Sequence, residues 1–270
     1  MVALAFPSEA RVATHRGVRG RRRIAKKRPV ALSHVEHPVG NALLASLTVA
    51  VRAQLEPHLQ CVHLDKNEVL FRAHEPVRIV HFPITAVISF VSRLESGQML
   101  EVGIVGRDGV AGSALFPGVT TMSCDGIVQI PGTAYRISAD LLRRQLLVSE
   151  SLSSAVARFA QVLLVRSMQM SVCNMFHSVE QRCIRWLLAV NDLTHQNLVP
   201  LTHDLIATML GVHRPTVTLV LGALRKAGLV TERRGQIVIR DRRRLEAACC
   251  ECYQVMRSEQ LRLLSASSAS

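Results

Sequence analysis

Basic and hydroxyl side chains, which can bind phosphate groups and the edges of nucleic-acid bases, are concentrated near one end of this 270-residue chain. Residues 201–245 carry nine lysines and arginines against three acidic residues. Residues 1–40 carry another nine against two, whereas residues 41–200 are almost neutral, with 13 basic and 12 acidic residues. Two basic segments around a neutral body predict a polyanionic partner that is bound locally. For residues 1–40 alone, a run of solvated charges explains the composition equally well.

Thiols are the other reactive groups. The seven cysteines are an odd number without the spacing of a disulfide framework, so we expect them to be reduced. Cys249, Cys250 and Cys252 lie together near the C-terminus and suggest metal binding or oxidant sensing, with His203 or His213 nearby in sequence. Adjacent cysteines rarely bind one ion, however, and no second pair has zinc spacing. We expect no metal and no other cofactor, and a thiol- or metal-sensing regulator remains the alternative.

Catalytic patterns are missing from the sequence. It has no Ser-His-Asp order, no H-E-x-x-H motif and no nucleotide-binding fingerprint. Glycines at 103, 106, 109 and 112 are regularly spaced, but no G-K-[ST] follows them, so they are interpreted as turn residues between strands. We therefore expect a protein that is not an enzyme.

Residues 202–220 have the spacing of two short helices joined by a tight turn. Thr202 is placed to cap the first helix, and Pro215 falls in the first turn of the second. Ala207 is small where the helices would cross, and Gly211 permits a left-handed backbone in the turn. The apolar positions expected to form the core between the helices are Ile206, Leu210, Val212, Val217 and Val220. This combination favours a DNA-binding helix-turn-helix over a hairpin that only packs.

The second of these helices would present an acid-free surface, because no acidic residue lies between Gly211 and Ala227. Such a surface suits a groove lined with phosphates. Beyond it, residues 228–232 and 236–239 alternate around Arg233 and Arg234, which predicts a hairpin, or wing, whose basic tip binds backbone phosphate. Plain solvation of two arginines at a turn is the alternative.

The elements that must position these residues form two groups. After a helix at 42–55, short apolar runs at 69–71, 79–82, 86–91, 100–104 and 127–130 predict an antiparallel barrel or roll. From residue 139 the period becomes helical, and S-x-x-Q at 178–181 predicts a capping box that starts a further helix. Residues 1–40 lack periodicity and are interpreted as a disordered tail.

A long helix is expected over residues 151–174. One stripe with heptad spacing, interrupted by Arg166, predicts a dimer seam through Val156, Phe159, Leu163 and Met170. A helix packed on its own roll is the alternative. The dimer seam and the packing on the roll are compatible if a second apolar stripe faces inward, formed by Leu152, Ala155, Val162 and Val165.

A β-roll, a long helix and the segment "LTHDLIATMLGVHRPTVTLVLGALRKAGLV" together resemble the Crp/Fnr family of transcription regulators. The resemblance covers roughly residues 41–250; it is specific over 201–240 and only architectural over the roll. It implies an α+β fold with an antiparallel, cyclic-nucleotide-binding-like sensor roll at 41–149 and a dimerisation helix at 150–175. A winged helix-turn-helix at 176–246 and a C-terminal segment at 247–270 follow, and the tail at 1–40 precedes them.

The resemblance also implies a homodimer that binds a palindromic operator in double-stranded DNA and contacts RNA polymerase. No stretch approaches about 18 uninterrupted apolar residues and the N-terminus is unlike a secretory signal, so we expect a cytoplasmic protein with no membrane partner. By motif match, Arg214 and Thr218 would contact bases. Thr202, His203, His213 and Thr216 would lie near phosphates, as would Arg233 and Arg234 of the wing. Pro215 and Leu219 replace two of the family's base-contacting positions, so its usual operator is not assumed. A non-specific architectural DNA-binding protein is the competing hypothesis.

The sensor roll departs from the family's cyclic-nucleotide binders. Gly112 stands where their ribose-binding glutamate would fall, and no arginine or lysine occurs between Val110 and Ala134. A buried phosphate there would have no cation, which disfavours cyclic AMP. The first 60 residues contain no cysteine, so the iron–sulfur centre of the oxygen-sensing branch is not expected either. The effector is left unassigned.

Overall fold

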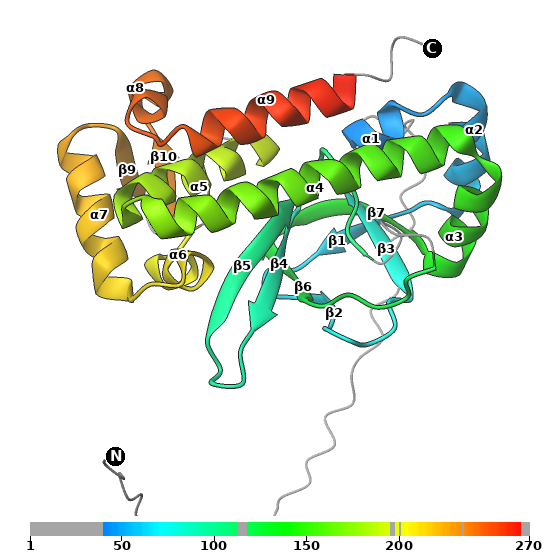
Figure 1. Cartoon of the computed structure of the whole chain (residues 1–270), viewed down its shortest axis with the longest axis horizontal. Helices are drawn as coiled ribbons and strands as arrows, with labels where there is room; N and C mark the ends of the chain where they lie inside the picture. Colours follow the sequence, from blue (N-terminus) through cyan, green and yellow to red (C-terminus); the bar gives the residue numbers. More distant parts are fainter. Residues whose placement is uncertain (1–39, 113–117, 195–197, 200, 234, 266–270) are drawn as a thin grey trace, which may run out of the picture. The chain divides into compact units, whose positions relative to one another are not determined.

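The computed structural model describes residues 40–112, 118–194, 198–199, 201–233 and 235–265 (Figure 1). Apart from residue 40, the tail predicted at 1–40 lies outside this range, and so does Arg234. Among the described residues, no single helix is long and apolar enough to cross a membrane. Two sharply bent helix pairs, 139–148 with 150–176 and 203–210 with 214–226, reach that length and hydropathy only when each pair is taken together.

The first helical segment is two helices, α1 (Ala42–Ala45) and α2 (Val49–Leu55), followed by a 3-10 turn, η1 (Glu56–His58). The single helix predicted over 42–55 is therefore broken. The Ser46 hydroxyl donates to the Leu43 carbonyl, and the Thr48 side chain caps α2 by accepting from the Val51 amide. Serine and threonine side chains that bond to nearby backbone end and start helices in this way.

Seven strands then build two antiparallel sheets, which confirms the roll. Their order is β1-β7-β3 in one sheet and β2-β6-β4-β5 in the other. The strands are β1 (Gln60–Leu64), β2 (Val69–Phe71), β3 (Ile79–Pro83), β4 (Val87–Arg93), β5 (Met99–Val105), β6 (Asp125–Ile130) and β7 (Gly132–Ser138). Strands β1 and β7 were not predicted from the sequence.

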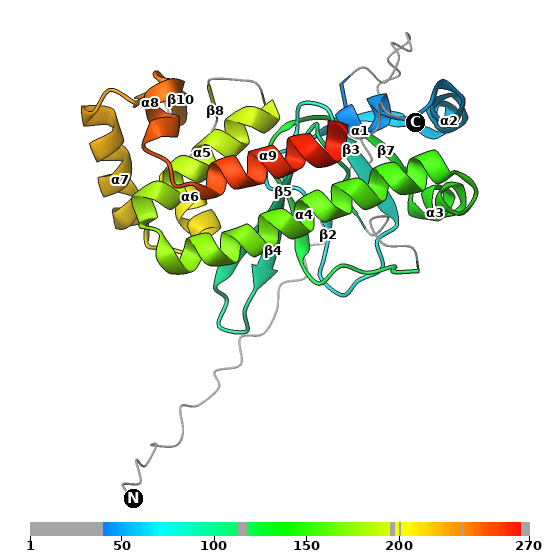
Figure 2. The same ribbon diagram turned by 45° about the horizontal axis from the view of Figure 1, so that its top comes forward.

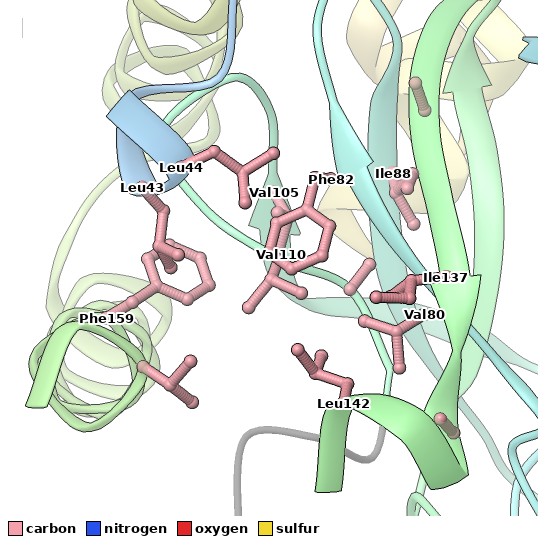
Figure 3. Packing of buried hydrophobic residues seen from close by; sticks show 14 of the residues in the cluster. Leu43, Leu44, Val80, Phe82, Ile88, Val105, Val110, Ile137, Leu142 and Phe159 are labelled. Atoms are coloured by element: carbon pink, nitrogen blue, oxygen red, sulfur yellow. The ribbon is translucent and has the colours of Figure 1, made fainter. Parts of the chain in front are cut away.

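Two helices, α3 (Ala139–Val148) and α4 (Glu150–Phe176), follow the roll, and α4 agrees with the long helix predicted over 151–174. Figure 3 shows Phe159 of α4 pointing toward Leu43, Leu44 and Val110 of the roll core. Its ring lies so close to Gly109 that a Cβ on that glycine would be 1.8 Å from it. Helix α4 is thus anchored on its own roll.

The stripe predicted as a dimer seam is the one that faces this core. Val156, Phe159 and Met170 have exposed fractions of 2%, 0% and 9%, and Leu163 packs against the same cluster. A side chain already covered inside its own protomer offers no surface to a partner, so the seam prediction is wrong. Heptad spacing alone does not tell whether an apolar stripe packs on its own domain or on a partner. The second stripe does face inward at Leu152, Ala155 and Val162.

The opposite side of α4 is apolar and exposed. Its large exposed side chains are Leu164, Met168, Val172, Met175 and Phe176. At 3.6 residues per turn these positions share one face of the helix. We call this set the outer stripe.

The remaining elements are α5 (Val179–Thr194), β8 (Leu198–Val199), α6 (His203–Leu210), α7 (Arg214–Lys226), β9 (Val230–Arg233), β10 (Gln236–Ile239), α8 (Arg242–Ala247) and α9 (Cys252–Ser265). The predicted capping box is present, since the Ser178 amide donates to Gln181 Oε1 (3.1 Å) and the Gln181 amide to Ser178 Oγ (3.3 Å). Helix α9, which was not predicted, packs along α4 (Figures 1 and 2).

Candidate nucleic-acid interface

Helices α6 and α7 are joined by the tight turn that the sequence predicts. Thr202 caps α6, because its hydroxyl oxygen accepts from the Leu205 amide (3.3 Å). Gly211 adopts φ +62° and ψ +41°, a left-handed conformation that glycine takes at little cost. A side chain there would also meet the roll, since a Cβ would lie 3.0 Å from Leu100 Cδ1.

The predicted helix-turn-helix core forms in part. Ile206, Leu210 and Val217 are buried, whereas Val212 and Val220 are only half-buried. Buried leucines further along α7, at 221 and 224, complete the contact. Because its apolar face is held in this way, α7 keeps its other face in solvent.

That outer face of α7 carries the predicted base-contacting residues. Arg214, Thr218 and Leu219 are all exposed. Arg214 Nε lies 3.3 Å from Asp204 Oδ1, but both side chains are mostly exposed, at 65% and 71%. An ion pair so open to water contributes little and yields readily to another partner. The Thr218 hydroxyl donates to the Arg214 carbonyl (3.2 Å), as helical threonines do.

His203 links the two helices to the wing. Its Nδ1 lies 2.9 Å from Thr218 Oγ1, and its Nε2 lies 3.2 Å from Glu232 Oε2 on β9. Both ring nitrogens are therefore engaged within the protein. His203 was predicted as a phosphate contact. It lies with Arg214 around a hollow of about 280 Å³ that is also lined by two carboxylates, Asp204 and Glu232, which were not predicted to belong to the site.

The other predicted phosphate contacts lie around this surface. Thr202, His213 and Arg233 are exposed, and Thr216 is half-buried. Arg233 ends β9, where β9, β10 and β8 form the small wing sheet. Arg234 lies outside the described residues. The two described arginines that are predicted to contact DNA, Arg214 and Arg233, thus lie at the start of α7 and at the end of β9.

Comparison with known proteins agrees with this geometry. Residues 181–248 match the family model of the Crp-like helix-turn-helix domain. The chain therefore contains a Crp-like helix-turn-helix domain in its C-terminal part. No curated protein sequence matches this chain.

Solved structures of Crp/Fnr proteins share the fold of this chain. One, from Eubacterium rectale and assigned to the Crp/Fnr family, has a TM-score of 0.59 at 19% identity, covering 76% of this chain and 96% of that one. The c-di-GMP-responsive global regulator CLP of Xanthomonas campestris has a TM-score of 0.59 at 17% identity, covering 72% and 100%. FixK2 of Bradyrhizobium japonicum has a TM-score of 0.57 at 18% identity, covering 71% and 98%.

The helix-turn-helix domain is bonded to the roll through a buried carboxyl group. Trp186 Nε1 on α5 donates to Glu101 Oε1 on β5 (2.9 Å), and the Ser89 hydroxyl on β4 donates to Glu101 Oε2 (2.7 Å). Burial raises the pKa of Glu101 to about 7, although these hydrogen bonds and the charge of Arg185 oppose the shift. Glu101 is therefore a titratable group placed where the two parts meet.

The C-terminal cysteines do not group with His203 or His213 among the described residues. Cys250 and Cys252 lie instead with Cys173 and His177 from the end of α4. Cys173 and His177 are four residues apart, so they share a helix face, and this C-x3-H spacing is a signal in the sequence from which the pair could be predicted. Cys249 is outside the group.

Proposed function

We propose that this regulator binds specific DNA sequences as a homodimer, with α7 recognising bases and the wing binding backbone phosphate. The observation that carries the proposal is the exposed, acid-free face of α7 that begins at Arg214, held out by a buried core and a glycine turn. An arginine at the start of such a helix can donate two hydrogen bonds to guanine in the major groove. We infer no catalytic step.

The outer stripe of α4 supports the dimer. Four of its residues, at 164, 168, 172 and 175, recur every three or four positions on a 27-residue helix, as in a two-helix seam. A contiguous apolar patch of this kind marks an interaction surface, and a second copy of α4 presents the matching stripe. Two-fold pairing would place two α7 helices on a palindromic site, with contact to RNA polymerase as the further step that the family suggests.

Replacing Arg214 with alanine should remove sequence preference at one base pair in each half-site. A bidentate arginine–guanine contact is worth roughly 1–3 kcal/mol of discrimination. Selection from randomised DNA, followed by binding at several salt concentrations, measures both preference and affinity. Arg233→Ala is the matched control. Because Arg233 is proposed to contact a phosphate, its loss should weaken the affinity for all DNA sequences about equally. It should also lower the slope of log affinity against log salt concentration by about one unit.

The roles are misassigned if Arg214→Ala keeps the full preference or if Arg233→Ala changes it. If the wild type itself shows no preferred DNA sequence, the hypothesis of a non-specific architectural protein is favoured instead.

Cyclic AMP and cyclic GMP should bind weakly or not at all. Gly112 occupies the position of the ribose-binding glutamate in the family's cyclic-nucleotide binders. Its φ of +135° is one that side-chain-bearing residues rarely adopt, and a Cβ there would lie 3.1 Å from Val80 Cγ2. The phosphate would also lack a cation between Val110 and Ala134. Calorimetry should detect no appreciable heat of binding, and a dissociation constant in the micromolar range or tighter would contradict this account of the roll.

A further inference from the structure

Four metal-binding side chains from distant parts of the sequence meet beside the junction of α4 and α5. They are Cys173 and His177 at the end of α4, and Cys250 and Cys252 at the start of α9. Their ligand atoms all lie within 4.8 Å of one another. Cys173 Sγ is 3.7 Å from Cys250 Sγ, and Cys252 Sγ is 3.4 Å from His177 Nδ1.

Two of these separations, 3.7 Å and 3.4 Å, are close to those of a tetrahedral site. With zinc–sulfur bonds of about 2.3 Å and zinc–nitrogen bonds of about 2.0 Å, two ligand atoms of a tetrahedron stand roughly 3.5–3.8 Å apart. Three thiolates and one imidazole are a standard structural zinc set, and soft thiolate ligands favour zinc over magnesium or calcium. We propose that Cys173, His177, Cys250 and Cys252 bind a single zinc ion.

Neighbouring residues are arranged as a metal site needs them. His177 Nε2 lies 3.3 Å from Glu251 Oε2, which leaves Nδ1 for the metal and orients the ring. Gln169 Nε2 donates to Cys252 Sγ (3.1 Å), a hydrogen bond that stabilises a thiolate.

The charge around the site is also compensated. Three thiolates, a neutral imidazole and a divalent cation carry one net negative charge. Arg185 is only 5% exposed, and its Nε has no hydrogen-bond partner among the described residues. Burial raises the pKa of Cys173 and the positive charge of Arg185 lowers it, so the two groups interact. A buried guanidinium needs an anionic neighbour, and the occupied site supplies one.

A single ion fits better than an iron–sulfur cluster. A cluster places several iron atoms between the thiolates and so spreads them further apart than one shared ion does. The compact grouping here leaves room for one metal.

The ion would tie the start of α9 to the end of α4. Only Ser178 separates His177 from Val179, where α5 begins. Metal binding would therefore fix the junction from which the DNA-binding domain extends, because ligands on both helices share one ion.

The test uses the full-length reduced protein, stripped of metal with a chelator and then titrated with Zn²⁺ or Co²⁺. The wild type should bind one ion per protomer, and bound cobalt should show the visible bands of a tetrahedral site together with thiolate charge transfer. Zinc should also raise the melting temperature. Cys250→Ser and Cys252→Ser should weaken binding by at least roughly 100-fold, the upper end of what a lost supporting residue costs.

Cys249→Ser is the matched control, because Cys249 adjoins Cys250 but is not in the ligand group. It should bind metal as the wild type does. The proposal is overturned if the reduced wild type binds no stoichiometric zinc, if cobalt shows an octahedral spectrum without charge transfer, or if Cys249→Ser abolishes binding. The wild-type measurements decide the matter even if a ligand variant fails to fold.

Discussion

Replacing Met168 with glutamate should convert the dimer into monomers. Met168 is 62% exposed at the middle of the outer stripe, and in a two-fold dimer both copies of the new carboxylate would be buried against apolar neighbours. A cost of about 3 kcal/mol or more corresponds to a dimer dissociation constant raised roughly 100-fold or more. Sedimentation over a range of concentrations measures this constant directly.

Two comparisons make the result specific to the stripe. Leu94→Glu changes a side chain of similar exposure (59%) in the loop after β4, and it should leave the dimer intact. Phe159→Glu places a charge in the roll core, so it should reduce the free energy of unfolding of each protomer rather than act only on association. An unchanged dimer in Met168→Glu would show that the outer stripe is not the interface.

The free energy of unfolding should fall as the pH rises from about 4.5 to about 7, because of Glu101. The pKa of this carboxyl group is raised from 4.5 to about 7 in the folded protein. Below pH 4.5 the group is protonated in both states and its contribution is fully present. Between the two values the unfolded chain loses the proton while the folded one retains it, so stability decreases and the loss is complete above about pH 7. At 1.36 kcal/mol per unit the change is about 3 kcal/mol.

Glu101→Gln tests this directly, because an amide keeps the acceptor oxygen for Trp186 Nε1 and does not titrate in this range. Denaturant unfolding at several pH values should show a flatter profile for the variant, which should exceed the wild type in stability at about pH 8. Glu95→Gln, in the exposed loop between β4 and β5, controls for the loss of a charge. If the wild type and Glu101→Gln have parallel profiles, Glu101 does not retain its proton as described.

The parts of the protein that depend on local spacing were predictable from the sequence. Thr202, Ala207, Gly211 and Pro215 act within a few residues of their partners, and together with the apolar spacing of residues 206–220 they predict the helix-turn-helix. The strand-like runs also predict the class of the N-terminal roll. Strand β1 escaped prediction because its exposed and half-buried positions, 60–63, lack a clear apolar alternation.

The parts that depend on distant pairing were not predictable. The predicted seam and the outer stripe of α4 both have helical periodicity, and only the position of Phe159 against Gly109 shows that the roll covers the predicted seam. The group of metal-binding side chains includes Cys173 and Cys250, which are 77 positions apart, so its spacing matches no metal-binding motif that could be recognised in the sequence. Likewise, the engagement of His203 by Glu232 follows from how the wing folds back on α6.

The central claim, that two α7 helices recognise a specific site together, is tested most directly with the wild-type protein on randomised DNA. Selection followed by footprinting should yield one preferred sequence with two-fold symmetry, its half-sites about one helical turn, or roughly 34 Å, apart on one face of the duplex. Enrichment of no sequence, or of a single unpaired half-site protected by one protomer, would contradict the account.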